Sequence, residues 1–143
     1  MHELDLDIIS PEKKVYSGKV KSVTIPGTKG NFQVLFNHAP LISTFELGII
    51  KVGLPGDSTR IFTTSGGSAE ILDNKVLLLS DTIEAVENID LERALKSKVR
   101  AEERLTNKSG SIDFDRARAS LAKAMNRIKA VEKYSTLKKD IPI

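Results

Sequence analysis

Five cationic side chains in the last third of the 143-residue sequence have a spacing that suits polyphosphate binding. Arg93 and Arg100 are seven residues apart, so a helix places both on one face. Arg116, Lys123 and Arg127 follow at spacings of seven and four, again on one helical face. If the two rows face each other, their repulsion favours an anion between them, and the paired N–H donors of Arg suit phosphate oxygens. Charge spacing alone also allows a solvated basic face or a nucleic-acid patch.

A six-residue pattern, I-D-x-x-R-A, occurs twice, at residues 89–94 and 112–117. In each copy the Asp suits the N-cap of a helix, and the Ile can pack on the Ala as a hydrophobic staple. Capping does not account for the Arg, because a cation in the first helical turn faces the positive end of the helix dipole, at a cost of roughly 0.3–1 kcal/mol. The repeated Arg therefore indicates a negative group nearby, either an acidic partner or a phosphate.

Two amphipathic helices are expected to position these cations, from Leu91 to about Thr106 and from Phe114 to about Tyr134. The short connection, residues 107–111, predicts an antiparallel hairpin. The stripes by which the two helices face each other are narrow and rich in alanine. We therefore expect a marginally stable hairpin whose folding is easily reversed. The stripe of the first helix contains Leu91, Ala94, Leu95, Val99, Ala101 and Leu105.

The preceding residues predict an antiparallel β-sandwich of about eight to ten strands, because short apolar runs alternate with turn signals. Gly66-Gly67 is interpreted as a hairpin turn, and His38 as a residue that supports a turn. The expected strands are residues 4–8, 19–25, 31–35, 47–54, 59–64, 68–72 and 75–79.

Charge and composition divide the chain near Glu87-Asn88. Residues 1–87 carry eight Lys and Arg against eleven Asp and Glu, whereas residues 88–143 carry fourteen against eight. The net charges of −3 and +6, and the concentration of eight of the nine glycines in the first part, indicate two modules. We therefore predict a β-sandwich domain at 1–87 and a helical hairpin domain at 88–143.

Composition also excludes several classes of function. The sequence has no cysteine, so disulfides, thiolate metal sites and a Cys nucleophile are excluded. His2 and His38 are too few for a His-based metal site, and no nucleophile–base pair is recognisable, so we expect neither a metal site nor catalytic residues. No apolar run approaches the roughly 18 residues of a membrane span, and the acidic start does not resemble a targeting peptide. An intracellular protein that reaches a membrane only through partners is expected.

The sequence resembles the epsilon subunits of bacterial F-type ATP synthases over nearly its whole length. In the second module, residues 89–94 match the ATP-binding motif of those subunits, and Asp113-Phe114 and residues 124–127 match their second helix. In the first module the matching segments are Ser10-Pro11-Glu12, Tyr16-Ser17-Gly18, residues 25–30, Asn37-His38-Ala39-Pro40-Leu41, Gly48-Ile49-Ile50-Lys51 and Ser65-Gly66-Gly67.

This resemblance implies a non-catalytic subunit in the central stalk of the rotor, at the cytoplasmic face of the bacterial plasma membrane. The sandwich would bind the gamma subunit and the c-ring, and so couple proton translocation to ATP synthesis. The hairpin would either fold against the sandwich or extend into the hexamer of alpha and beta subunits, where it blocks ATP hydrolysis. Its charge of +6 would then favour docking to acidic segments of the beta subunits.

The resemblance also implies an ATP site on the hairpin, with ATP as a regulatory ligand and no other cofactor. Because no Walker motif is present, Mg²⁺ should not be required. Position 123 is Lys where tighter ATP binders carry Arg, which loses a bidentate contact. By position, Glu84, Ile89, Asp90 and Ala94 would contact the base and ribose, and Arg93, Arg100, Arg116, Lys123 and Arg127 would surround the phosphates.

The alternative function is a β-sandwich adaptor with a basic helical tail that binds nucleic acid. Such a tail needs aromatic side chains between its cations for base stacking. Phe114 and Tyr134 are the only aromatic residues beyond residue 88, so the sequence favours the ATP synthase interpretation and predicts no nucleic-acid partner.

Overall fold

The computed structural model describes residues 2–107 and 113–140. Residues 108–112 lie outside the described residues; they comprise most of the expected connection at 107–111 and Ile112 of the second I-D-x-x-R-A copy. Eight strands of the described chain form one hydrogen-bonded sheet, in the order β2-β1-β7-β6-β5-β3-β4, with β8 paired to β6. The strands are β1 (Leu4–Ile9), β2 (Lys14–Val20), β3 (Ser22–Gly27), β4 (Gly30–Val34), β5 (Leu41–Gly53), β6 (Thr59–Leu72), β7 (Lys75–Ser80) and β8 (Ile83–Ala85).

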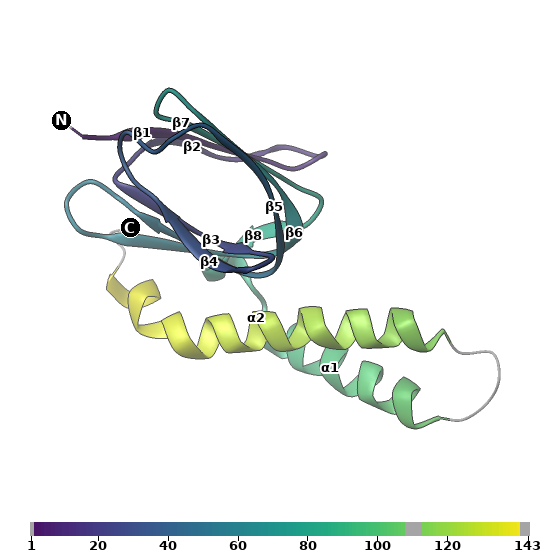
Figure 1. Cartoon of the computed structure of the whole chain (residues 1–143). Helices are drawn as coiled ribbons and strands as arrows, with labels where there is room; N and C mark the ends of the chain where they lie inside the picture. Colours follow the sequence, from purple (N-terminus) through teal and green to yellow (C-terminus); the bar gives the residue numbers. More distant parts are fainter. Residues whose placement is uncertain (1, 108–112, 141–143) are drawn as a thin grey trace.

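The sheet folds over itself into two layers, as Figure 1 shows: β1, β2 and β7 lie in one layer, and β3 and β4 lie in the other. The long strands β5 and β6 curve along the side that joins the layers. Described neighbours pair antiparallel except β1 and β7, which are parallel. The predicted sandwich of about eight to ten strands followed by two helices is confirmed with eight strands, although the parallel pairing of β1 with β7 departs from the expected all-antiparallel pattern.

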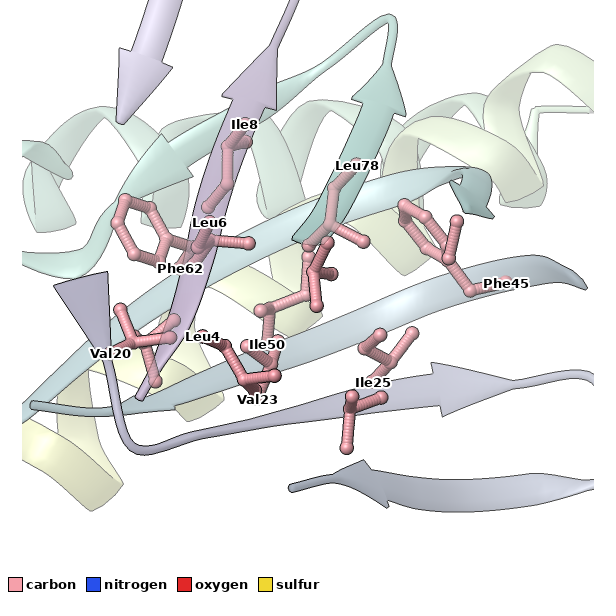
Figure 2. Close-up of a cluster of buried hydrophobic side chains, with 14 of the residues drawn as sticks. Leu4, Leu6, Ile8, Val20, Val23, Ile25, Phe45, Ile50, Phe62 and Leu78 are labelled. Atoms are coloured by element: carbon pink, nitrogen blue, oxygen red, sulfur yellow. The ribbon is translucent and has the colours of Figure 1, made fainter. Parts of the chain in front are cut away.

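The main core lies between the two layers, because alternate residues of each strand point inward. Residues of β1 alternate between buried and half-buried positions, the pattern of a strand with one face on a core. Phe62 is fully buried, and Figure 2 shows it beside Leu6 in a cluster to which strands of both layers contribute side chains. Burial of each such side chain contributes about 1.5–3 kcal/mol to the free energy of folding.

The interpretation of Gly66-Gly67 as a hairpin turn is wrong, because β6 passes through both glycines without a break. A Cβ on Gly67 would lie 1.9 Å from the carbonyl oxygen of Leu79, so only glycine permits this approach of β6 to β7. Gly66 has a φ of +115°, and its N–H donates to Thr64 Oγ1 at 3.0 Å. The two glycines therefore bend one long strand instead of ending two short ones.

The predicted strand at 19–25 is also wrong, since β2 ends at Val20 and β3 begins at Ser22. Lys21 lies between them, and its N–H donates to the Gly53 carbonyl at 2.7 Å. Val20 and Val23 are both buried although they are three residues apart. The alternation of buried and exposed side chains therefore shifts by one residue where the chain passes from β2 to β3. The sequence also did not predict a separate β2, the early start of β5 at Leu41, β8, or the short 3₁₀ helix η1 (Val86–Asn88).

Two antiparallel α-helices follow in the described chain: α1 (Leu91–Thr106) and α2 (Phe114–Asp140), which kinks at Tyr134. The predicted helices are confirmed, but α2 continues beyond Tyr134. The residues that α1 and α2 bury are almost all alanines, with Ala94, Ala101, Ala117 and Ala124 each at most 4% exposed. The predicted apolar stripe is therefore partly wrong: Leu95 and Val99 are 44% and 52% exposed, because the close contact is made by small residues on the adjacent face.

Figure 1 shows the C-terminal part of α2 beneath the layer of β3 and β4, whereas the start of α2 and the end of α1 extend beyond the sandwich. A second apolar cluster fills the contact, formed by Ile61 of β6, Val86 of η1, Ile89 and Ala130 of α2, with Tyr134 packed against it. Neither described helix has an apolar stretch of the length that a bilayer crossing requires.

Candidate functional site

A cavity of about 330 Å³ opens where β8, η1 and the start of α1 meet the middle of α2. Its position follows from the chain order, because β8 leads through η1 directly into α1, and α2 returns beside them. Six of the nine predicted site residues line it, together with two residues that the sequence did not suggest. The lining residues are Glu84, Asn88, Ile89, Asp90, Arg93, Ala94, Ser97 and Arg127.

The start of α1 forms one wall of the cavity, and it is capped as the repeated sequence pattern predicts. Asp90 Oδ1 accepts a hydrogen bond from the backbone N–H of Arg93 at 3.1 Å. Asp113 Oδ1 accepts from the N–H of Arg116 at the same distance at the start of α2. The capping function of both Asp residues is confirmed, and each bond satisfies a free N–H of the first turn. Ile89 is only 8% exposed and packs into the cluster under the sandwich.

Glu84 and Arg127 form an ion pair across the cavity, in which Arg127 Nε donates to Glu84 Oε1. The two side chains are 32% and 30% exposed, so water screens the pair only in part. The neighbouring Asn126 donates its Nδ2 hydrogen to the Gly48 carbonyl at 2.8 Å. Two successive side chains of α2 thus attach the hairpin to the sandwich.

The structure does not bring Arg100, Arg116 and Lys123 into this cavity. Arg100 lines a groove on the outer side of α1 beside Leu95. Lys123 lines a much smaller hollow next to Arg127. Arg116 is exposed near the start of α2, and an α-helical rise puts it about 16 Å along the axis from Arg127. Of the five predicted phosphate contacts, Arg93 and Arg127 line the cavity in the described structure.

A second ion pair close to the site was not predicted from the sequence. Arg60 Nη2 of β6 donates to Glu87 Oε1 of η1 at 2.6 Å, and the side chains are 29% and 24% exposed. The Arg60 guanidinium lies 5.3 Å from the centre of the Phe62 ring and 5.8 Å from that of Tyr16. Burial raises the pKa of the Tyr16 phenol, and the charge of Arg60 opposes this shift. The pair fixes the segment that leads from the sandwich into the cavity.

Comparison with known families identifies both the sandwich and the helical part of the chain. Residues 3–86 match the family model of the ATP synthase delta/epsilon chain, beta-sandwich domain, and residues 87–132 match that of the long alpha-helix domain. The chain belongs to the ATP synthase delta/epsilon family. As an epsilon chain it is one subunit of an ATP synthase.

Individual relatives agree with this assignment. The ATP synthase epsilon chain of Desulfitobacterium hafniense is 46% identical over 125 residues, which cover 87% of this chain and 93% of the relative. The epsilon chain of Desulforamulus reducens is 42% identical over 127 residues, covering 89% and 96%. A chain in the solved Euglena gracilis mitochondrial ATP synthase (OSCP, F1 and c-ring) has the same fold, with a TM-score of 0.79 at 20% identity, covering 90% of this chain and 81% of that one.

Proposed function

We propose that this chain is a non-catalytic rotor subunit of a bacterial ATP synthase, which inhibits ATP hydrolysis through its hairpin and senses ATP there. The sandwich binds the gamma subunit and the c-ring, and the hairpin reaches the alpha and beta subunits when it leaves the sandwich. The fold similarity to chains of solved ATP synthases supports this placement, among them the central stalk and c-ring of the Tetrahymena thermophila mitochondrial enzyme. The chain then lies at the cytoplasmic face of the plasma membrane, attached through the complex.

A mobile hairpin is supported by the small number of contacts that the structure describes between it and the sandwich. They consist of one apolar cluster, the Glu84–Arg127 pair and the bond from Asn126 to Gly48. Within the hairpin, alanines make the helix contact and bury little area per residue. Each contribution is small, so a partner that binds the released hairpin can shift the equilibrium.

The observation that carries the ATP proposal is the cavity itself. Its volume of about 330 Å³ lies at the lower end of the range of roughly 300–1,000 Å³ for small-molecule sites. It combines the apolar surface of Ile89 with the guanidinium of Arg93, which makes no ion pair with another described residue. The small exposed surface of Ile89 suits contact with a base, and a free guanidinium suits a phosphate.

Because the cavity forms only when the hairpin lies on the sandwich, ATP should stabilise that arrangement and oppose inhibition. Titration of the purified chain with ATP, GTP and pyrophosphate, each with and without Mg²⁺, tests this directly. Millimolar ATP should raise the melting temperature more than GTP or pyrophosphate does, and EDTA should not abolish the effect. Equal shifts with all three ligands would reduce the effect to nonspecific anion binding.

A second experiment tests the proposed inhibition. The full chain is added to a complex of the alpha, beta and gamma subunits, and ATP hydrolysis is measured at low and high ATP. Hydrolysis should fall on addition of the chain, and less so at millimolar ATP. A chain that binds gamma without any effect on hydrolysis would rule out the inhibitory function.

A further inference from the structure

Some of the polar side chains that line the cavity form hydrogen bonds or ion pairs within the described protein, and others do not. Glu84 and Arg127 pair with each other, and Asp90 caps α1. Asn88 and Ser97 line the same cavity, and neither side chain forms a hydrogen bond with another residue of the described chain. These two groups are therefore free to meet a ligand.

Serine is an unfavourable residue at position 97, which lies in the interior of α1. Serine is less favourable than alanine in a helix interior by roughly half a kcal/mol, and it often bonds back to a carbonyl one turn earlier. Ser97 is half-buried and makes no such bond in the described structure, so the helix gains nothing from its hydroxyl. Ser97 lines the cavity and lies four residues after Arg93, on the same side of α1, so its hydroxyl is suited to a phosphate oxygen instead.

The order of residues along the chain gives the two ends of the cavity different chemical character. Asn88 lies before the helix, beside buried Ile89 and the carboxylate of Asp90. Arg93 lies in the first turn, and Ser97 lies one turn further, about 10 Å along the axis from the N-cap. The Asp90 carboxylate disfavours phosphate at the first end, whereas the unpaired Arg93 guanidinium attracts phosphate toward the second.

We propose that Asn88 recognises the base of the nucleotide in this cavity and that Ser97 donates a hydrogen bond to its phosphates. This inference rests on the ATP site proposed above and adds the residues that set its selectivity. A carboxamide offers one donor and one acceptor side by side, which match the N6 amino group and the adjacent ring nitrogen of adenine. Guanine presents an oxygen in place of that amino group, so the same pair of bonds is lost.

The experiment is calorimetric titration of the full chain and its variants with ATP, GTP and sodium tripolyphosphate. Asn88→Ala should weaken ATP binding about tenfold, bring the ATP and GTP affinities within about twofold of each other, and leave tripolyphosphate binding unchanged. Ser97→Ala should weaken ATP and tripolyphosphate binding alike, by about three- to tenfold, and leave the ratio of ATP to GTP affinity unchanged.

Matched controls use the same side-chain types in similar surroundings outside the cavity. Asn31 of β4 is exposed, as Asn88 is, and Ser120 of α2 is a half-buried helical serine, as Ser97 is. Neither control residue lines the cavity, so Asn31→Ala and Ser120→Ala should leave all three affinities unchanged. Melting temperatures without ligand should stay within about 2 °C of the parent chain for the four variants, since substitutions outside the core change stability little.

The outcomes separate the two proposals. A parent chain that binds neither ATP nor tripolyphosphate would overturn the nucleotide site itself. A parent chain that binds ATP selectively, with an unchanged ATP to GTP ratio in Asn88→Ala, would overturn base recognition by Asn88 alone. Unchanged tripolyphosphate affinity in Ser97→Ala would likewise remove Ser97 from the phosphate contacts.

Discussion

Arg127 of α2 pairs with Glu84 of β8 across 43 residues of sequence, and both residues line the cavity that the hairpin forms with the sandwich. The same contact therefore holds the hairpin down and occupies two of the charged groups assigned to ATP by resemblance. Under the proposed function, a nucleotide in the cavity would meet Arg93 as the free cation of the described lining residues, and it would compete with Glu84 for Arg127. We therefore expect the state of this pair to link nucleotide binding to the position of the hairpin.

Glu84→Gln should loosen the hairpin, because it leaves the half-buried Arg127 guanidinium without a counter-charge. The expected loss is roughly 1–2 kcal/mol, between the values of surface and fully buried pairs. Faster amide hydrogen exchange along α2 measures it. The control is Asp115→Asn, which removes the exposed Arg118 pair and should change exchange little. Equal exchange in both variants would show that the Glu84–Arg127 pair does not hold the hairpin.

Arg93→Glu and Arg116→Glu should affect ATP differently, although both residues occupy the same place in the repeated pattern. Each change places a carboxylate in a first helical turn and should stabilise its helix by roughly 0.3–1 kcal/mol without ligand. Only Arg93 lines the cavity, so Arg93→Glu should weaken ATP binding by at least about 1.5–3 kcal/mol, and Arg116→Glu by much less. Calorimetry with ATP measures both, and unchanged affinity in Arg93→Glu would leave its arginine without a function in binding.

Gly67→Ala should disrupt the sandwich, because the new methyl group would lie 1.9 Å from the Leu79 carbonyl oxygen and 2.9 Å from the Phe45 ring. The strands must separate to admit it, so we expect a loss of more than about 3 kcal/mol in the free energy of unfolding by urea. Gly18→Ala is the control, since its nearest neighbour is the Tyr16 hydroxyl at 3.2 Å. Similar losses in the two variants would contradict a special requirement for glycine at 67.

Truncation after Asn88 should leave a folded sandwich, because the main core contains no residue beyond Ala85. The fragment loses Ile89 and Ala130 from the second cluster and exposes Ile61, so its melting temperature should fall while unfolding stays cooperative. It should still bind gamma and lose both ATP binding and inhibition. A fragment without near-ultraviolet circular dichroism would show that the sandwich needs its hairpin to fold.

The sequence alone determined the features of this protein that depend on interactions between residues close together in the chain. The caps at Asp90 and Asp113 and the helices that follow them depend on neighbouring residues, and the sequence predicted both. The wrong predictions concern pairing between distant segments. Gly66 and Gly67 have the composition of a turn, but their position opposite Phe45 and Leu79 makes them a bend in a long strand.

The candidate site shows the same division. Helical spacing alone placed Arg93 and Arg100 on one face, but only the tertiary structure decides that the cavity ends between them and that Arg116 lies at the far end of the hairpin. The ion pair of Glu84 with Arg127 and the free groups of Asn88 and Ser97 also depend on how the hairpin lies on the sandwich. The spacing of residues in a helix determines which side chains share one face of it. Contact between residues far apart in the sequence depends instead on how the surfaces of the hairpin and the sandwich pack together.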